Sequence, residues 1–397
     1  MSTAPALIPV TEAQSRLFAL GAPLVIETVP LAQTIGRWVA RDVVALRTQP
    51  AADLSAMDGY AIRFADLPGP FRLIGESAAG RGFAGSLGAG ETVRIFTGAP
   101  LPTGADSVLV QEEAEAEGAD IRLTGEGPTR RGGNVRPCGL DFHQGDVLIG
   151  AGERITAARL AVAAIGGHAA LPVRRRVAVA IVGTGDELVR PGAPLRDDQV
   201  PESNGAMLAA MLTDWPVELI DLGALPDRLD MLRDAFAAVR ADILVTTGGA
   251  SVGDHDLVRP ALLAAGGSLD FWRIALRPGK PMMAGRLGDA IVLGLPGNPV
   301  SVFMTATLFL KPLIAALSGA AAPLPPTRRA ILGEPLKAND HRTDYLRAAT
   351  RDGRVFAAAI QDSSMLRTLA RADCLIVRQP HAPAAAPGDE IEILPIA

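Results

Sequence analysis

Short apolar runs alternate with segments of helical periodicity between residues 177 and 317. The runs that predict strands begin at Val177, Val217, Asp242, Phe271 and Ala290, and the segments that predict helices are 205–212, 228–239, 257–265 and 299–317. This alternation is typical of a mostly parallel sheet with helices on both faces, and such sheets bind ligands beyond the carboxyl ends of their strands. The sequence therefore predicts a three-layer α/β domain over residues 173–318, with a functional site at that edge.

Glycines and ionisable side chains follow several of these strands. The segments are GTGDEL at 183–188, Asp227, TTGGASVGDHD at 246–256, RPGKP at 277–281 and LPGNPVS at 295–301. A glycine-rich loop before a helix presents N–H groups that suit an anion, and carboxylates beside a phosphate need a metal ion between them. A phosphate with Mg²⁺ satisfies both. We expect substrate at Gly248, Gly249 and Ser251, and Mg²⁺ among Asp186, Glu187, Asp227, Asp254 and Asp256.

Two further groups are candidates for binding the same anion. Lys280 lies between Pro278 and Pro281, and an ammonium held by rigid backbone is a good phosphate partner. Asn298-Pro299 is the pattern of a helix N-cap followed by a proline at the first helical position. Gly297, Asn298 and Ser301 would then surround a helix N-terminus, which attracts anions. A purely structural alternative stays open, because Asn298, like Asp256, can be present only as a helix cap.

Other nucleotide and catalytic motifs are absent from the sequence. GTGDEL lacks the third glycine of a dinucleotide-binding loop, and Gly279-Lys280 is followed by Pro281 instead of the Ser or Thr of a phosphate-binding P-loop. The five histidines are dispersed, and only His255 lies inside the central loop. We therefore expect catalysis by positioning and electrostatics at a metal-bridged phosphate, without covalent nucleophilic attack.

The flanking segments predict three more domains. Residues 1–45 read as helical, with a capping-box pattern at Thr11 and Gln14, a stop at Gly21 and a second helix over 31–40. Residues 46–139 carry short apolar stretches separated by turn residues and predict a mostly β domain. The helix expected at 156–165 resembles the helical pattern of residues 1–45 more than the β pattern between them. We therefore expect residues 1–45 and 140–172 to form one elongated domain into which the β domain is inserted. Residues 319–397 predict a linker and a small C-terminal β domain.

Two loops of the β domain allow more than one interpretation. In SAMDGYA, Asp58-Gly59 can be the tight turn of a hairpin or part of a ligand site. In TGAPLPTGAD, which starts at Thr97, prolines and glycines make a stiff loop that can hold a ligand or only turn a corner.

Composition excludes several classes of protein. The net charge is −5 and no basic stripe is present, which argues against nucleic-acid binding. The two cysteines are far apart and suit a reducing cytosol, and the N-terminus has no signal-peptide pattern. The most apolar segment, 300–310, meets Lys311-Pro312 and is expected to be a buried helix too short to cross a membrane. We therefore expect a cytoplasmic protein without membrane contact.

Nine motifs in this order resemble the molybdopterin molybdenumtransferase family, which includes the E domain of gephyrin. They are SAMDGYA at 55–61, RIFTGAPLPTGAD at 94–106, VAIVGTGDEL at 179–188, ESNGAML at 202–208, TTGGASVGDHD at 246–256, RPGKP at 277–281, LPGNPVSVF at 295–303, DYLRA at 344–348 and DSSMLRTLARAD at 362–373. The resemblance covers nearly the whole chain, and the number of long motifs makes it specific.

The resemblance implies an elongated homodimer that inserts molybdate into adenylyl-molybdopterin and releases AMP to form the molybdenum cofactor. It implies an active site between the α/β domain of one subunit and the β domain of the other. It assigns catalytic roles to Asp58, Glu187, Asp256 and Lys280. By the same motifs, Thr97, Asp141, Arg347 and Ser363 are expected to bind substrate. It also points to a molybdopterin adenylyltransferase and molybdoenzyme chaperones as partners.

Two departures and three alternatives accompany this interpretation. Arg277 replaces a lysine of many relatives, which changes donor geometry, and Asp362-Ser363-Ser364 replaces a Gly-Ser-Gly or Gly-Ser-His, which puts the role of Ser363 in question. The alternatives are a molybdopterin adenylyltransferase, because such enzymes share the α/β domain, and a scaffold without catalysis. Tungstate in place of molybdate also stays open.

Overall fold

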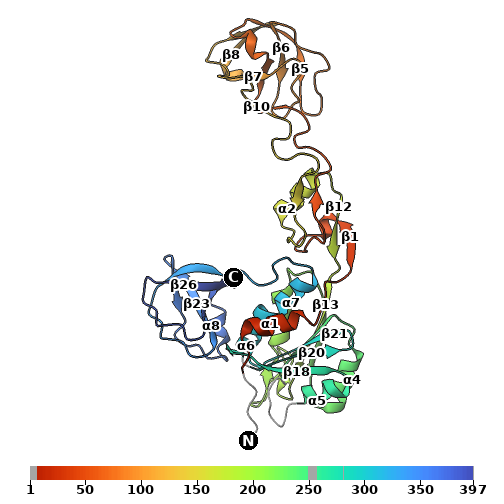
Figure 1. Cartoon of the computed structure of the whole chain (residues 1–397), viewed down its shortest axis with the longest axis vertical. Helices are drawn as coiled ribbons and strands as arrows, with labels where there is room; N and C mark the ends of the chain where they lie inside the picture. Colours follow the sequence, from red (N-terminus) through yellow and green to blue (C-terminus); the bar gives the residue numbers. More distant parts are fainter. Residues whose placement is uncertain (1–6, 249–256, 280, 397) are drawn as a thin grey trace.

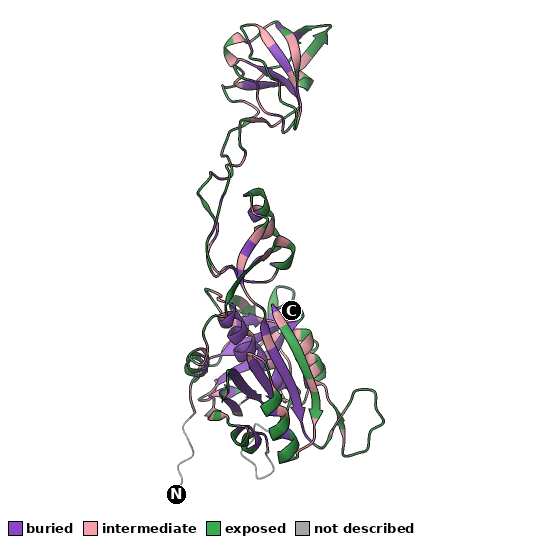
Figure 2. Cartoon of the chain, turned by 90° about the vertical axis from the view of Figure 1, so that its right-hand side faces the viewer, coloured by how far each residue is buried: buried purple, intermediate pink, exposed green. Residues whose placement is uncertain are grey.

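The protein is an elongated chain of four domains. Its structure is a computed structural model that describes residues 7–248, 257–279 and 281–396. A mostly β domain stands at one end, a small domain around β1, β12 and α2 lies in the middle, and the α/β domain lies at the other end with the C-terminal domain beside it (Figure 1). Buried residues concentrate in the sheet and helices of the α/β domain (Figure 2).

The α/β domain is built on a six-stranded sheet of order β16-β13-β17-β21-β20-β18. The strands are β13 (Val177–Thr184), β16 (Val217–Leu225), β17 (Ile243–Thr247), β18 (Ser268–Arg273), β20 (Pro281–Leu287) and β21 (Ala290–Leu295). The first four strands of that order are parallel, and β20 is antiparallel to both β21 and β18. The expected mostly parallel sheet is therefore confirmed.

Helices cover both faces of this sheet, as the alternation predicts. They are α3 (Asn204–Leu212), α4 (Leu229–Ala238), α5 (Val258–Ala264), α6 (Pro299–Thr305) and α7 (Lys311–Leu317). One core contains Leu208 of α3 and Leu313 of α7 against the Val179 face of β13, while the other contains Leu232 of α4 and Leu262 of α5. Successive strand residues point to opposite faces, which is why β13 is buried on both sides.

The helix predicted over residues 299–317 is confirmed. Helix α6 continues through a π-helical turn at Ala306–Leu310 into α7, so Lys311-Pro312 does not end it. A wider turn tolerates the proline, which lacks an N–H and would clash inside a regular helix. Among the described residues this helix, Pro299–Leu317, is long and apolar enough to cross a membrane by composition, yet 83% of its apolar window is buried inside the protein. Such burial is also found for core helices of globular domains.

The N-terminal segment is less helical than expected. Helix α1 (Val10–Phe18) starts after Pro9, so the capping box predicted at Thr11 and Gln14 is wrong. It packs on the α/β domain, and strand β1 (Ile26–Pro30) then pairs antiparallel with β12 (Ala170–Arg174). The helix predicted over 31–40 is also wrong, since only a single 3-10 turn forms at Leu31–Gln33. The backbone at Trp38 and Val39 pairs with Arg154 and Val173 instead, so long-range pairing overrides local preference.

A two-stranded stem carries the inserted β domain. The stem is β2 (Val43–Val44) with β11 (Val147–Ile149), next to helix α2 (Ala157–Ile165), whose predicted start is confirmed by the Thr156 side chain that caps the Arg159 N–H. The domain has a sheet of order β7-β4-β6-β5-β9-β8 and a separate short pair formed by β3 (Leu54–Ser55) and β10 (Val135–Arg136). Its strands are β4 (Gly59–Ile62), β5 (Phe71–Ser77), β6 (Glu91–Ile95), β7 (Ser107–Val110), β8 (Ala114–Glu117) and β9 (Asp120–Leu123).

The C-terminal domain is a small closed barrel. Strand β23 (Thr343–Arg351) pairs with both β24 (Arg354–Ala357) and β25 (Cys374–Arg378), and β22 (Arg328–Leu332) and β26 (Glu390–Pro395) complete the circle. The short helix α8 (Leu366–Leu369) follows the 358–365 loop. Strand β19 (Leu276–Arg277) leaves the α/β domain and pairs with the start of β23, which fixes the barrel beside the sheet.

Candidate active site

The predicted strand-end segments meet at one edge of the α/β sheet. Strands β13, β17 and β21 end there at Thr184, Thr247 and Leu295. Because β20 is antiparallel to β21, its first residue, Pro281, lies at the same edge. The loops at 183–188, 277–279 and 295–301 are thereby brought together with Gly248, as the sequence predicted. Gly249, Ser251, Asp254, Asp256 and Lys280 lie outside the described residues.

Backbone atoms of Thr184, Gly248 and Gly297 line the bottom of the site at this edge, and we call them the floor of the site. Gly248 has a φ of +90°, and a Cβ there would lie 2.5 Å from the carbonyl oxygen of Thr184. A Cβ on Gly297 would lie 3.5 Å from the Cα of Gly248. Three strand ends therefore approach too closely for side chains at Gly248, which leaves peptide groups to face a ligand.

Asn204 is a polar residue of this floor that the candidate set did not contain. Its amide nitrogen donates to the Gly297 carbonyl at 2.9 Å, and it is only 7% exposed. Within the described residues its buried amide oxygen has no hydrogen-bond partner. The ESNGAML motif at 202–208 was the signal in the sequence, but spacing alone did not place Asn204 beside the glycine loops.

Three carboxylates gather next to the floor. The Asp227 N–H donates to Asp186 Oδ1 at 2.9 Å. Burial raises the pKa of Asp227, and the neighbouring carboxylates of Asp186 and Glu187 raise this pKa further. Like charges collected in a partly buried place attract a cation. Within the described part of the chain, however, no three such side chains already form a metal-binding cluster.

The N-terminus of α6 joins the sheet edge to the C-terminal domain. Asn298 occupies the N-cap position and Pro299 the first turn, but the Asn298 side chain makes no capping bond. Its amide nitrogen donates instead to the Ser363 hydroxyl at 2.8 Å. Ser301, one turn into the helix, is 5% exposed. Asn298 and Ser363, predicted from motifs far apart in the chain, are thus in direct contact.

Arg347 stands behind the Ser363 loop and supports it. Its side chain is only 1% exposed. The guanidinium donates to the Gln361 side-chain oxygen at 3.2 Å and to the carbonyls of Asp362 at 2.9 Å and Met365 at 3.3 Å. These bonds are internal to the C-terminal domain. We therefore give Arg347 a positioning role, in place of the substrate contact expected from the sequence.

The Arg277 side chain also binds to other residues of the same chain. It forms ion pairs with Asp344 at 2.7 Å and with Asp340 at 3.1 Å, and its hydrogen bond to Asp344 raises the pKa of its guanidinium. The planar fork of arginine suits two carboxylates at once. The lysine-to-arginine departure therefore affects the contact between sheet and barrel.

Asp58 and Thr97 form a second polar centre in the β domain. Asp58 Oδ1 accepts the Thr97 N–H at 2.7 Å and the Thr97 hydroxyl at 2.9 Å. The Thr97 N–H and then its hydroxyl lower the pKa of Asp58, and Arg94 lowers this pKa further. The hairpin interpretation of Asp58-Gly59 is wrong, because β3 pairs with β10 and β4 with β6 and β7.

Asp141 lies apart from both centres. It is exposed near the stem of the β domain, where its N–H donates to the Gln49 carbonyl at 3.0 Å. Within one chain, the domain that holds Asp58 and Thr97 stands at the end of the molecule opposite the sheet edge (Figure 1). A single subunit therefore places the predicted residues in three separate locations: the sheet edge with the adjoining barrel loop, the β domain and the stem.

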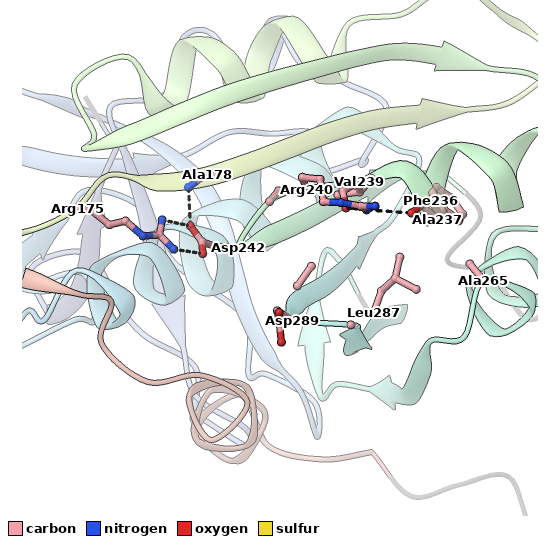
Figure 3. A pocket seen from close by; sticks show the side chains of 13 residues that line it. Arg175, Ala178, Phe236, Ala237, Val239, Arg240, Asp242, Ala265, Leu287 and Asp289 are labelled. Atoms are coloured by element: carbon pink, nitrogen blue, oxygen red, sulfur yellow. Dashed lines mark hydrogen bonds and ion pairs between the residues drawn. The ribbon is translucent and has the colours of Figure 1, made fainter.

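The opposite edge of the sheet has a cavity of a different character. It measures about 600 Å³ and lies where the strands begin (Figure 3). Arg175 forms two hydrogen bonds with Asp242, at 2.7 and 2.6 Å, and Asp242 also accepts the Ala178 N–H. The Arg240 guanidinium donates to the carbonyls of Ala237 and Val239. These charged groups are occupied with structural bonds, so this cavity does not compete with the strand-end edge.

Comparisons with known proteins match this arrangement along the chain. Residues 8–167 match the MoeA N-terminal region (domain I and II), residues 180–316 a probable molybdopterin binding domain, and residues 329–396 the MoeA C-terminal region (domain IV). A crystal structure of the molybdopterin biosynthesis MoeA protein from Pyrococcus horikoshii superimposes with a TM-score of 0.83 at 26% identity, over 98% of this chain and 100% of that one. Fold and site thus define a MoeA-type multidomain protein.

Two sequence relatives extend over nearly the full length. A molybdopterin molybdenumtransferase from Haemophilus influenzae is 34% identical over 98% of both chains. One from Bacillus subtilis is 32% identical over 93% of this chain and 90% of its own. The chain belongs to the molybdopterin molybdenumtransferase family.

Proposed function

We propose that this protein inserts molybdate into adenylyl-molybdopterin, releases AMP and so completes the molybdenum cofactor in the cytoplasm. The observation that carries the proposal is the meeting of a backbone floor, a carboxylate cluster and a helix N-terminus at one sheet edge. This site lies in a chain similar from end to end to molybdopterin molybdenumtransferases. Both substrates are anions that such a site suits.

Different groups among the described residues suit the phosphate and the metal ion. The peptide groups at Gly248 and Gly297, with the N-terminus of α6 beyond Asn298, suit phosphate oxygens. Asp186, Glu187 and Asp227 fit Mg²⁺, because hard cations prefer carboxylate oxygens and the three carboxylates lie close enough for Asp186 and Glu187 to raise the pKa of Asp227 beyond the effect of its burial. When bound, the ion would neutralise phosphate charge. Lys280, Asp254, Asp256, Gly249 and Ser251 are proposed to complete the site by their place in the same loops.

The active protein is proposed to be a homodimer with two composite sites. Asp58 and Thr97 make a preorganised carboxylate at the distal end of the chain, far from the sheet edge of the same subunit (Figure 1). An antiparallel partner would bring its β domain to this edge, and isologous dimers repeat such a contact twice. Asp141, near the stem, would approach the same site.

The assignment is tested by supplying purified protein with adenylyl-molybdopterin, molybdate and Mg²⁺ and measuring AMP and molybdenum cofactor. We expect both products in equal amounts, and little product without Mg²⁺. Formation of adenylyl-molybdopterin from ATP and molybdopterin would favour the adenylyltransferase instead, although matches on both sides of the α/β domain argue against it. Binding of neither substrate would favour a scaffold. Replacing molybdate by tungstate in the same assay measures oxyanion preference.

A further inference from the structure

A second pocket lies where three domains and the interdomain linker meet. It measures about 430 Å³. Trp38 and Arg154 come from the middle domain, Trp215 and helix residues from the α/β domain, and Pro395 and Ile396 from the end of the last barrel strand and the residue after it. The pocket is separate from the proposed active site, because Lys311 begins α7 whereas the sheet-edge site lies at the start of α6.

Two cationic side chains lie against two tryptophan rings on one side of this pocket. The Arg154 guanidinium carbon lies 5.4 Å from the ring centroids of both Trp38 and Trp215. The two rings lie 5.7 Å apart at an interplanar angle of 52°. The Lys311 ammonium lies 5.5 Å from the Trp215 centroid. Both cations are held near aromatic faces, where the attraction grows as water is excluded.

These cations have no carboxylate partner within ion-pair distance among the described residues. Arg154 donates to the carbonyls of Gly36 at 2.9 Å and Asp214 at 2.6 Å, and the Asp214 carboxylate acts on it only at longer range. Burial lowers the pKa of Lys311, and the positive charge of Arg154 lowers this pKa further. A bound anion would relieve the repulsion.

Two sides of the pocket, mostly apolar, come from the long helix and from the linker. Phe303, Thr307, Lys311 and Ala315 are spaced four residues apart along the long helix, so they line one side of the pocket. Residues 322–326, which include three prolines, form another side. Proline restricts the backbone of this linker, so little chain entropy is lost when a ligand binds. The volume lies within the range that holds a small organic ligand.

We propose that this pocket binds a small organic anion: a flat aromatic ring system with one carboxylate. The acid group pairs with Lys311 and Arg154, while the ring packs against Trp215, Phe303 and the proline wall. The charge selects anions and the walls select flat apolar bodies. A free inorganic anion would use only the first of these contacts. The inference is independent of the proposed transferase activity, since it uses none of the sheet-edge residues.

The test is calorimetric titration of the full-length protein with 1-naphthoate as the probe. We expect saturable binding below about 1 mM, and affinity about tenfold weaker for the neutral analogue 1-naphthalenemethanol, because one charged contact is lost. Lys311→Met keeps the side-chain stem and should weaken 1-naphthoate about tenfold, whereas Lys311→Arg should retain it. Lys337→Met removes a charge from an exposed lysine and serves as the control.

Several results would overturn the proposal. These are no saturable binding of 1-naphthoate, equal affinity for the neutral analogue, unchanged affinity in Lys311→Met, and inorganic phosphate binding as tightly as 1-naphthoate. Thermal melting checks that each variant is folded. If Lys311→Met fails this check, Trp38→Leu provides the second variant and should also weaken the probe, because it removes one of the two rings that hold the Arg154 guanidinium in place. Transferase activity of Lys311→Met is measured in parallel and should be unchanged. A negative result for ligand binding at this pocket can then be distinguished from a negative result for the proposed transferase function.

Discussion

The Asn298 amide donates a 2.8 Å hydrogen bond to the Ser363 hydroxyl, and this bond joins the N-cap of α6 to a loop of the C-terminal barrel. Asn298 therefore does more than stand at a helix N-cap, because its side chain makes no capping bond. The arrangement leaves the N–H groups of the first helical turn available to a ligand. It also gives the barrel a direct connection to the sheet-edge site.

Removing this bond should affect turnover more than folding. We expect Ser363→Ala to lower kcat/KM for cofactor formation about fivefold, since a hydrogen bond of this kind contributes about 1 kcal/mol. The Tm should change little, because Ser363 is partly exposed. Steady-state kinetics measure the effect, and Ser86→Ala, an exposed serine in the β domain, is the matched control. A variant with full activity would show that the bond has no functional role.

Arg347 should matter mainly for the stability of the barrel. Replacing it by Met leaves the oxygens of Gln361, Asp362 and Met365 without their donor, and we expect a loss of about 3 kcal/mol in the free energy of unfolding. Arg347→Lys should recover only part of this, because one ammonium cannot reproduce the planar fork. Urea unfolding measures both variants. Arg354→Met on the neighbouring strand, where the arginine is exposed, should be neutral; an equal loss there would contradict the positioning role.

Asp227 should make the folded protein less stable as the pH rises through its raised pKa. The folded state binds this proton more tightly than the unfolded state, so the contribution is full below the unfolded value and is lost above the folded one. Asp227→Asn should remove that dependence and raise Tm at pH 7 slightly, on the order of 1 °C. Thermal melts across pH 3–7 measure this.

The same variant also tests the proposed magnesium site. Mg²⁺ should raise the Tm of the unmodified protein, because an ion that binds only the folded state stabilises it. The rise should be much smaller for Asp227→Asn. An exposed acid on β16, Asp221, provides the control as Asp221→Asn. Equal Mg²⁺ responses in all three proteins would remove Asp227 from the proposed ligands.

The effect of Asp58 on stability should depend on pH in the opposite direction to that of Asp227. Its pKa is lowered by Thr97, so its contribution to stability is present above the unfolded pKa and is lost as the pH falls through the lowered value. Thr97→Val keeps the backbone N–H but removes the hydroxyl, so the Asp58 pKa should rise part of the way back towards its usual value. Thr97→Ser should keep it low. Carboxyl ¹³C NMR titration reads the pKa directly, and no difference between Val and Ser would contradict the hydroxyl contribution.

Local patterns predicted the α/β domain well because its signals are strong and consistent. The periodic runs from Val177 onward gave the strands and helices, and the rule for strand ends brought Gly248 to the loops at 183–188 and 295–301. The sequence pattern did not predict the antiparallel strand β20 as an element of its own, because its residues MMAGRL follow directly after the RPGKP loop.

Long-range contacts account for what the sequence did not predict. Trp38 and Val39 look compatible with a helix until Arg154 and Val173, more than 100 residues later, offer strand-like partners. Arg347 was selected from a motif, but only burial and its oxygen partners show that it supports the Ser363 loop. No periodicity indicates such partners, since they are set by tertiary packing.

The composite site can be tested by mixing two inactive variants. Asp58→Ala alters the β-domain centre and Glu187→Ala the sheet edge. If each site uses the edge of one subunit and the β domain of the other, a heterodimer of the two variants has one intact site and one doubly altered site. Random mixing makes half of the dimers heterodimers, so activity should recover to about a quarter of the unmodified level. A site contained within one chain would give no recovery.

The control for this experiment uses two changes in the same domain. Asp58→Ala and Thr97→Ala lie in contact in the β domain, so every site of their heterodimer keeps one altered β-domain centre. Unfolding and remixing these two variants should therefore leave activity at the level of either alone. Native mass spectrometry confirms that exchange has occurred in both mixtures. Recovery in the control would trace the effect to refolding, whereas recovery only in the Asp58→Ala and Glu187→Ala mixture requires that residues of two subunits act on one substrate.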